Sequence, residues 1–128
     1  MKSPGQRFRI LPGLYAVCRL NPDTAVPAWA SGPFLNLTFT DDELTVICPA
    51  EHVPAEVRAE RDWRVLKLVG PFAFSAVGVL ASLATPLARA GISVLSIATY
   101  DTDYFLVKND TFEDAIAVLV AAGHTRIG

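Results

Sequence analysis

The sequence has 128 residues, which suffices for one domain of ordinary size or for two very small domains that share a core. Hydrophobic residues make up 52% and charged residues 19%, a balance that allows a packed core and excludes a disordered chain. The formal net charge is -2 and the Lys and Arg residues are scattered, so no basic stripe is available to bind nucleic acid.

Membrane, export and metal signals are all weak. No apolar run approaches the length of a membrane span, and the N-terminal segment MKSPGQRFRILPG lacks an apolar core of signal-peptide length. We therefore expect a cytoplasmic protein with no membrane partner. Cys18 and Cys48 lie in strand-like runs and are expected to be buried thiols. Because His52 and His124 lack the spacing of metal ligands, we expect neither a metal nor a cofactor.

In the first half, strand-like runs are separated by turn signals. Pro12-Gly13 suits the centre of a type II turn, so the two runs beside it are predicted to form a hairpin. Leu35, Leu37 and Phe39 alternate with polar residues, which is the period of a strand. The predicted elements are strands over 6–11, 14–20, 34–40 and 44–48, and short helices near 26–30 and over 54–62.

The second half shows the clearer pattern. A helix is predicted from a cap at Ser75 to Gly91, with a buried stripe at Leu80, Leu83, Ala84 and Leu87. Pro86 lies inside this helix and must remove the hydrogen bond to the Ser82 carbonyl. A second helix is predicted from Thr111 to Gly123, because Thr111 and Asp114 have the spacing of a helix start. The predicted strands are 63–69, 92–99, 103–108 and 124–128, the last of them at a sheet edge.

The order strand, helix, strand, strand, helix, strand is that of a ferredoxin-like βαββαβ unit. The first half aligns with the second at an offset of sixty positions, which places Asp41 on Asp101 and Glu43 on Asp103. Although chance alignment stays open, we favour an internal repeat. The predicted fold is therefore α+β, with two ferredoxin-like modules over residues 1–61 and 62–128. Each module would have an antiparallel sheet with its helices on one face, and the first would be degenerate.

Two segments could bind a ligand. The segment GPFAFS before the first helix would present free backbone N–H groups, which attract a carboxylate or a phosphate. Asp101 and Asp103 could attract an ammonium or guanidinium group, or one of them could serve in acid–base chemistry. The alternatives are a purely structural helix cap at Ser75 and an ordinary solvated turn at the two acids. Taken together, an anion site and a cation site match the two ends of an amino acid.

A catalytic function is not supported. No His stands beside a Ser or Cys nucleophile, the first loop has no Arg to bind an acyl phosphate, and no phosphate-binding loop is present.

The segment LVGPFAFSAVGVLASLATPLARAGISVLSIATYDTDYFLVKNDTFEDAIAVLVAAG resembles an ACT domain, a small-molecule-binding regulatory module. It is most similar to the bacterial stand-alone ACT proteins related to the cytosolic arginine-sensor (CASTOR) family, and the segment FLNLTFTDDELTVIC resembles their companion module. The resemblance implies a βαββαβ fold, no catalysis, and an amino acid or a related metabolite bound at a module interface. It places the ligand-binding residues at Gly70, Pro71, Phe72, Phe74, Ser75, Val77, Gly78, Ala98, Thr99, Tyr100, Asp101, Thr102 and Asp103.

By this resemblance the loop amides and Ser75 would hold the carboxylate, while Asp101 or Asp103 would hold the amino group or a basic side chain. The protein is expected to form a homodimer and to regulate a partner protein in trans, since no enzyme domain is present in these residues. The alternative is a module for protein–protein interaction or dimerisation that binds no ligand.

Overall fold

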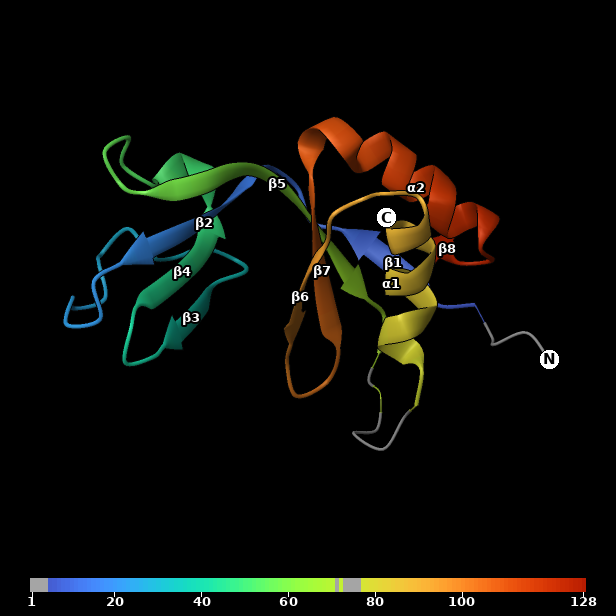
Figure 1. The fold of residues 1–128 in the computed structure, drawn as a ribbon, viewed down its shortest axis with the longest axis horizontal. Coiled ribbons are helices and arrows are strands. Elements are labelled where there is room, and N and C mark those ends of the chain that lie inside the picture. Colours follow the sequence, from blue (N-terminus) through green and yellow to red (C-terminus); the bar gives the residue numbers. More distant parts are fainter. Residues whose placement is uncertain (1–4, 71, 73–76) are drawn as a thin grey trace. The chain divides into compact units, whose positions relative to one another are not determined.

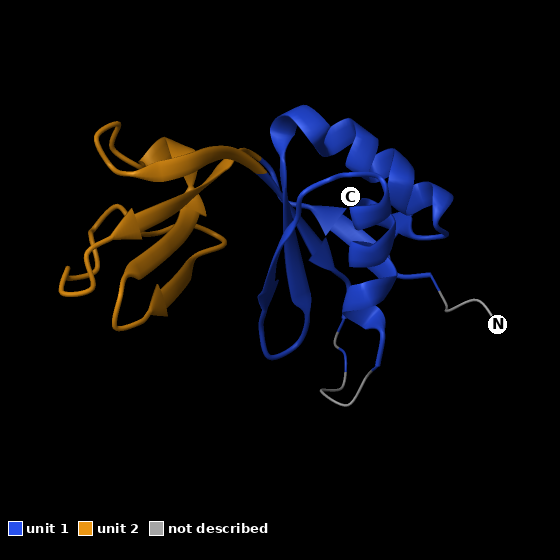
Figure 2. Ribbon diagram, in the orientation of Figure 1, with its two compact units in different colours: residues 1–12, 64–128 blue, residues 13–63 orange. Residues whose placement is uncertain are grey.

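The computed structural model of the protein describes residues 5–70, 72 and 77–128 (Figure 1). By their contacts, residues 13–63 form one compact unit, and residues 1–12 with 64–128 form another (Figure 2). We call residues 13–63 the inserted unit and the rest the main unit. The elements are β1 (Arg7–Ile10), β2 (Tyr15–Leu20), β3 (Asn36–Phe39), β4 (Leu44–Pro49), η1 (Ala50–His52), β5 (Ala59–Leu68), α1 (Val79–Arg89), β6 (Leu95–Ala98), β7 (Asp103–Lys108), η2 (Asn109–Thr111), α2 (Phe112–Ala121) and β8 (Thr125–Arg126).

The main unit has the predicted βαββαβ order in β5, α1, β6, β7, α2 and β8. Its sheet order is β8-β1-β5-β7-β6. Strand β1 therefore lies between β5 and β8, which are the first and last strands of the βαββαβ unit. Arg9 on β1 pairs with Lys67 in an antiparallel ladder, whereas Arg7 pairs with Thr125 in a parallel one. The sheet is therefore mixed, and the prediction of a purely antiparallel sheet is wrong at β8.

The hairpin predicted around Pro12-Gly13 is also wrong. Gly13 has a φ of +83°, as a type II turn requires, but β1 pairs with β5 and β8 while β2 pairs with β4 and β5. The Pro-Gly sequence thus predicts the conformation of the turn, yet a turn does not decide whether the strands on either side of it pair with each other. Residues 5–12 consequently pack with the main unit, and the predicted domain division at residue 61 falls inside β5.

Both helices of the main unit end at glycine, as predicted. After α1, Gly91 has a φ of +74°, its N–H donates to the Ala88 carbonyl, and the Ile92 N–H donates to the Leu87 carbonyl. These two bonds define a Schellman motif, and α2 ends in the same way at Gly123. α2 starts directly after Thr111, as predicted, although the Thr111 hydroxyl donates to the Lys108 carbonyl and does not cap the helix.

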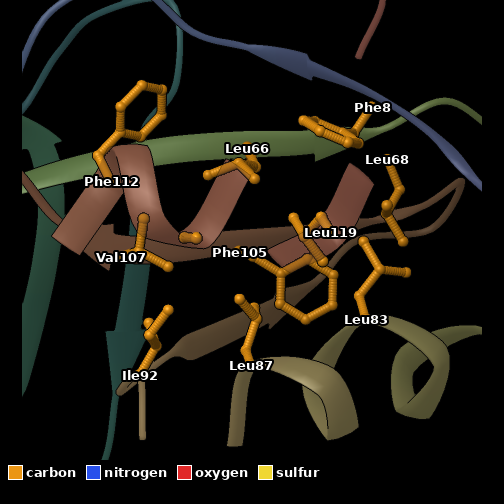
Figure 3. Packing of buried hydrophobic residues seen from close by; sticks show 11 residues of the cluster. Phe8, Leu66, Leu68, Leu83, Leu87, Ile92, Phe105, Val107, Phe112 and Leu119 are labelled. Atoms are coloured by element: carbon orange, nitrogen blue, oxygen red, sulfur yellow. The ribbon is translucent and has the colours of Figure 1, made fainter. Parts of the chain in front are cut away.

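The core of the main unit lies between the sheet and the two helices. Leu66 and Leu68 on β5 alternate toward the same face as Phe105 and Val107 on β7, as expected for extended strands (Figure 3). Both helices pack against this face, which is the arrangement that the single apolar stripe of each helix requires. The full buried cluster comprises Phe8, Leu66, Leu68, Leu83, Leu87, Ile92, Phe105, Val107, Phe112, Ala115 and Leu119.

The inserted unit, whose residues are all described, has the sheet order β3-β4-β2-β5 and contains no α-helix. The helices predicted near 26–30 and over 54–62 are therefore wrong. The second segment has helix-forming residues, but its end pairs with β2 through Ala59 and Glu60 and is held extended. Loop residues such as Trp29, Val53 and Val57 pack on one face of this sheet in place of helices.

Candidate functional site

The turn between β6 and β7 is built by two threonines. The Thr99 N–H and its hydroxyl both donate to the Thr102 carbonyl at 2.8 Å, and the Thr102 N–H donates back to the Thr99 hydroxyl at 3.4 Å. Threonine and serine favour such turns because the hydroxyl bonds to nearby backbone. Asp101 lies within this turn, and Asp103 is the first residue of β7. The two acids would lie on one face of a strand only if both were in extended conformation. Because Asp101 lies in the turn, they do not share a strand face.

The turn between β3 and β4 has the same set of bonds. The Thr40 N–H and hydroxyl donate to the Glu43 carbonyl, and the Glu43 N–H donates to the Thr40 hydroxyl at 3.1 Å. Thr40 and Thr99 are 59 positions apart, so the two hairpins match at 59 positions, one fewer than the offset read from the sequence.

The turn of Thr99–Thr102 is also tied to the segment that follows β5. The Thr102 side chain is 7% exposed, and its hydroxyl donates to the Leu68 carbonyl at 2.9 Å. The Phe72 N–H donates to the Asp101 carbonyl at 2.9 Å. A Cβ added to Gly70 would lie 2.8 Å from that same carbonyl oxygen, so the close approach of the two segments requires glycine.

The first helix begins later than predicted. α1 starts at Val79 with Gly78 as its N-cap residue, which has a φ of +81° and makes no side-chain cap. The predicted start at Ser75 is therefore wrong, because Gly78 sits in the left-handed region just before the helix. The first N–H groups of a helix have no partner within the helix, so the start of α1 can offer donors to a ligand.

A cavity of about 240 Å³, which we call the turn cavity, lies between the start of α1 and the turn after β6. It brings Phe72, which belongs to the first segment that the sequence singles out, together with the acidic turn, which is the second. Its wall is apolar at Phe72 and Val79 and acidic at Asp101 and Asp103. Its lining residues are Phe72, Gly78, Val79, Leu80, Ala98, Thr99, Tyr100, Asp101, Thr102 and Asp103.

Most of the predicted site residues that the structure describes line this cavity. Gly70 lies beside it against the Asp101 carbonyl, while Val77 is 96% exposed and does not line it. Pro71, Phe74 and Ser75 lie outside the described residues. Sequence reasoning missed Val79 and Leu80, which a correct helix start would have placed in the first turn.

The charges of the turn cavity have one sign. Among the described lining residues, Asp101 and Asp103 are the acids, and none is Lys, Arg or His. The intervening segment PFAFSA contains no charged residue type either. A cationic group would be attracted to this lining, whereas a second carboxylate on a ligand would be repelled by it.

Two other properties of the described residues bear on chemistry. No group of three or more His, Cys, Asp or Glu side chains is arranged to hold a metal ion within residues 5–70, 72 and 77–128. In the same ranges no helix is both long and apolar enough to span a membrane.

The two thiols are buried and free, as predicted. Burial raises the pKa of the Cys18 thiol from 9.0 to about 11, with a further contribution from nearby Cys48, while Arg61 acts in the opposite direction. Burial also raises the pKa of the Cys48 thiol. Both groups therefore stay protonated and unreactive at neutral pH.

Two family models match the chain, and the boundary between them falls near the end of the inserted unit. The family model described as an ACT domain matches residues 58–121, which is half of the chain. A second family model, for an N-terminal domain, matches residues 13–56.

Among curated proteins, the human cytosolic arginine sensor for mTORC1 subunit 1 is 40% identical over 58 residues, which cover 44% of this chain and 18% of the human protein. The rat protein of the same name is 27% identical over 101 residues, or 73% of this chain and 30% of the rat protein. This chain therefore spans less than a third of the length of these relatives.

Among solved structures, protein Atu0741 from Agrobacterium tumefaciens is 37% identical with a TM-score of 0.92, covering 98% of this chain and 94% of that one. Protein VC0802 from Vibrio cholerae is 25% identical with a TM-score of 0.76, covering 92% and 90%. The regulatory subunit of aspartate kinase from Thermus thermophilus is 9% identical with a TM-score of 0.59, covering 96% of each chain, and shares the fold. From the family model and the similarity to Atu0741, we conclude that the chain belongs to the ACT domain family.

Proposed function

We propose that this protein is a non-catalytic regulatory module that binds an amino acid in the turn cavity. The observation that carries the proposal is the meeting of the α1 start and the acidic turn around one cavity of about 240 Å³. Backbone donors at the start of α1 suit the α-carboxylate, and Asp101 or Asp103 suits the α-amino group. The remaining site residues, Gly70, Pro71, Phe74, Ser75 and Val77, would complete the site from the segment before α1.

The charges of the lining favour a basic amino acid. One carboxylate can pair with the α-amino group, which leaves a second for a cationic side chain. Arginine is the first candidate, because the curated relatives with matching segments are named as arginine sensors. Glutamate and aspartate are disfavoured, because their side-chain carboxylate would lie beside Asp101 and Asp103 without a cation to pair with.

The protein is further proposed to consist of two related modules and to act as a cytoplasmic homodimer on a partner protein in trans. The corresponding strand orders β3-β4-β2 and β6-β7-β5 and the matching turns at Thr40 and Thr99 support two related modules.

Isothermal titration of the full chain against the twenty amino acids tests the proposal. We expect saturable binding of arginine or another basic amino acid and weak or no binding of glutamate. A folded protein that shows no heat of binding with any amino acid would contradict the proposed function.

A second candidate is a module that contacts a partner protein through the same region. Leu80 and Tyr100 line the turn cavity yet are 45% and 80% exposed, and Val77, directly before Gly78, is 96% exposed, so apolar side chains are available to a partner. A thermal-shift series with the same amino acids separates the two candidates. A ligand that binds only the native state raises the melting temperature, whereas a module that only binds proteins does not respond.

A further inference from the structure

His124 is held at a defined position directly after α2. Its N–H donates to the Leu119 carbonyl at 3.0 Å, and Gly123 before it has a φ of +98°. These are features of the Schellman motif that ends α2. The His124 side chain is 5% exposed and is therefore part of the interior of the main unit.

Both ring nitrogens of His124 have partners. The Gln6 N–H donates to Nδ1 at 2.9 Å, and Nε2 lies 2.8 Å from the Ser82 carbonyl oxygen. Since Nδ1 accepts a hydrogen bond, the proton of the neutral ring is on Nε2, which donates to Ser82. The Ser82 carbonyl is available because Pro86, four residues later in α1, has no N–H to donate to it.

Ser82 continues this connection to the turn cavity. Its N–H donates to the Gly78 carbonyl at 2.9 Å, and its hydroxyl donates to the Val79 carbonyl at 2.7 Å. Gly78 and Val79 both line the turn cavity. His124 does not line it; it lines a separate cavity of about 510 Å³ between the two helices. A side chain outside the ligand site is thus joined to it through one residue of α1.

We propose that His124 is a positioning residue for the turn cavity. Its bond to Ser82 fixes the first turn of α1, and so sets where the backbone donors of that turn stand opposite Asp101 and Asp103. The proposal rests on the proposed function for its effect on ligand affinity. It predicts that losing the Ser82 bond weakens ligand binding more than losing the Gln6 bond, although each change removes one partly buried hydrogen bond.

Two substitutions separate these bonds. In His124→Gln the side-chain amide nitrogen reaches the place of Nε2 and can donate to Ser82, while the acceptor for Gln6 is lost. In His124→Asn the side-chain oxygen takes the place of Nδ1 and can accept from Gln6, while the donor to Ser82 is lost. We expect both variants to unfold at lower urea concentration than the wild type, because each leaves one backbone group without its partner.

The decisive measurement is titration of the wild type and both variants with arginine. We expect His124→Asn to weaken binding by about tenfold, the scale of one lost hydrogen bond, and His124→Gln to stay within about threefold of the wild type. Equal losses in the two variants would show that His124 only stabilises the fold, and unchanged affinity in both would show that the Ser82 bond does not act on the site. Either result overturns the proposal.

Amide hydrogen exchange without ligand keeps this proposal separate from the proposed function. We expect His124→Asn to accelerate exchange in the first turns of α1 relative to His124→Gln, measured against the amides of β7 as internal reference. Equal exchange in the two variants would overturn the proposal even if arginine binds. If the wild type binds no amino acid, the proposed function fails, while the exchange data still decide the role of His124.

Should His124→Asn fail to fold, Ser82→Ala takes its place. This variant keeps the carbonyl bond to His124, removes only the hydroxyl bond to Val79 and introduces a strong helix former. We expect weaker arginine binding with a melting temperature near that of the wild type. Wild-type affinity in this variant would exclude the route through the Ser82 hydroxyl to Val79.

Discussion

The backbone N–H of Phe72 donates to the carbonyl oxygen of Asp101 across 2.9 Å, and this bond joins the segment after β5 to the turn after β6. The acidic corner of the protein is therefore held by backbone contacts to the segment that precedes α1. Gly70, two residues before Phe72, also lies close to the Asp101 carbonyl oxygen.

Gly70→Ala should disturb the turn cavity, because the added Cβ would lie 2.8 Å from the Asp101 oxygen. The turn must shift to make room, and we expect a loss of about 1–3 kcal/mol in the free energy of unfolding, as for other overpacked sites. Urea unfolding followed by circular dichroism measures this loss. The matched control is Val77→Ala at a 96% exposed position, which should change stability by less than about 0.5 kcal/mol.

Asp103→Asn should weaken the binding of arginine by about tenfold or more, because the proposed ion pair becomes a hydrogen bond from the cation to an uncharged amide oxygen. The matched control is Asp110→Asn, which makes the same charge change at an exposed residue of η2 that does not line the turn cavity. Calorimetry on both variants compares them directly. Equal affinities for Asp103→Asn and Asp110→Asn would move the cation site away from β7.

The buried thiol of Cys18 should make the fold less stable in alkali. Its pKa is about 11 in the folded chain and 9.0 ordinarily, so above pH 9 the unfolded chain can lose a proton that the folded chain retains. The stabilising contribution is complete below pH 9 and is lost as the pH rises toward 11. Urea unfolding at pH 8, 9 and 10 should show a steeper decline for the wild type than for Cys18→Ala, in which this proton is absent. Parallel declines would mean that the thiol is not shielded.

Gly91→Ala should destabilise the protein by about 1 kcal/mol, because an alanine disfavours the φ of +74° that ends α1. Nothing lies within 4 Å of the added Cβ, so the cost comes from the backbone conformation alone. Gly91→Asn should cost less, since asparagine tolerates the left-handed region better than alanine does. Thermal unfolding of the two variants checks the order, and a larger cost for asparagine would contradict this explanation.

The sequence by itself points to the turn at Thr99–Thr102 and to the segment before α1 as candidate binding segments, but it does not show that they touch. The contact itself depended on the order β5-β7-β6, which puts the end of β5 beside the turn between β6 and β7. The role of Pro86 was visible as a missing helical donor. That His124 bonds to the Ser82 carbonyl could not be predicted, because this bond joins the first turns of α1 to the residues that follow α2.

The wrong structural predictions concern short segments that pair with strands far away in the sequence. Residues 54–62 have the composition of a helix, but Ala59 and Glu60 pair with β2 and the segment ends in β5. The turn at Pro12-Gly13 formed as expected, yet β1 pairs with β5 and β8, whose partner residues lie more than fifty positions away.

Turns, helix ends and apolar stripes follow from a few neighbouring residues, since backbone preference and side-chain period act over that distance; for this chain they were enough to indicate the α+β class and the acidic corner. Strand neighbours, the parallel edge at β8 and the burial of His124 depend on contacts between remote segments, which lower the free energy only when the whole sheet is assembled.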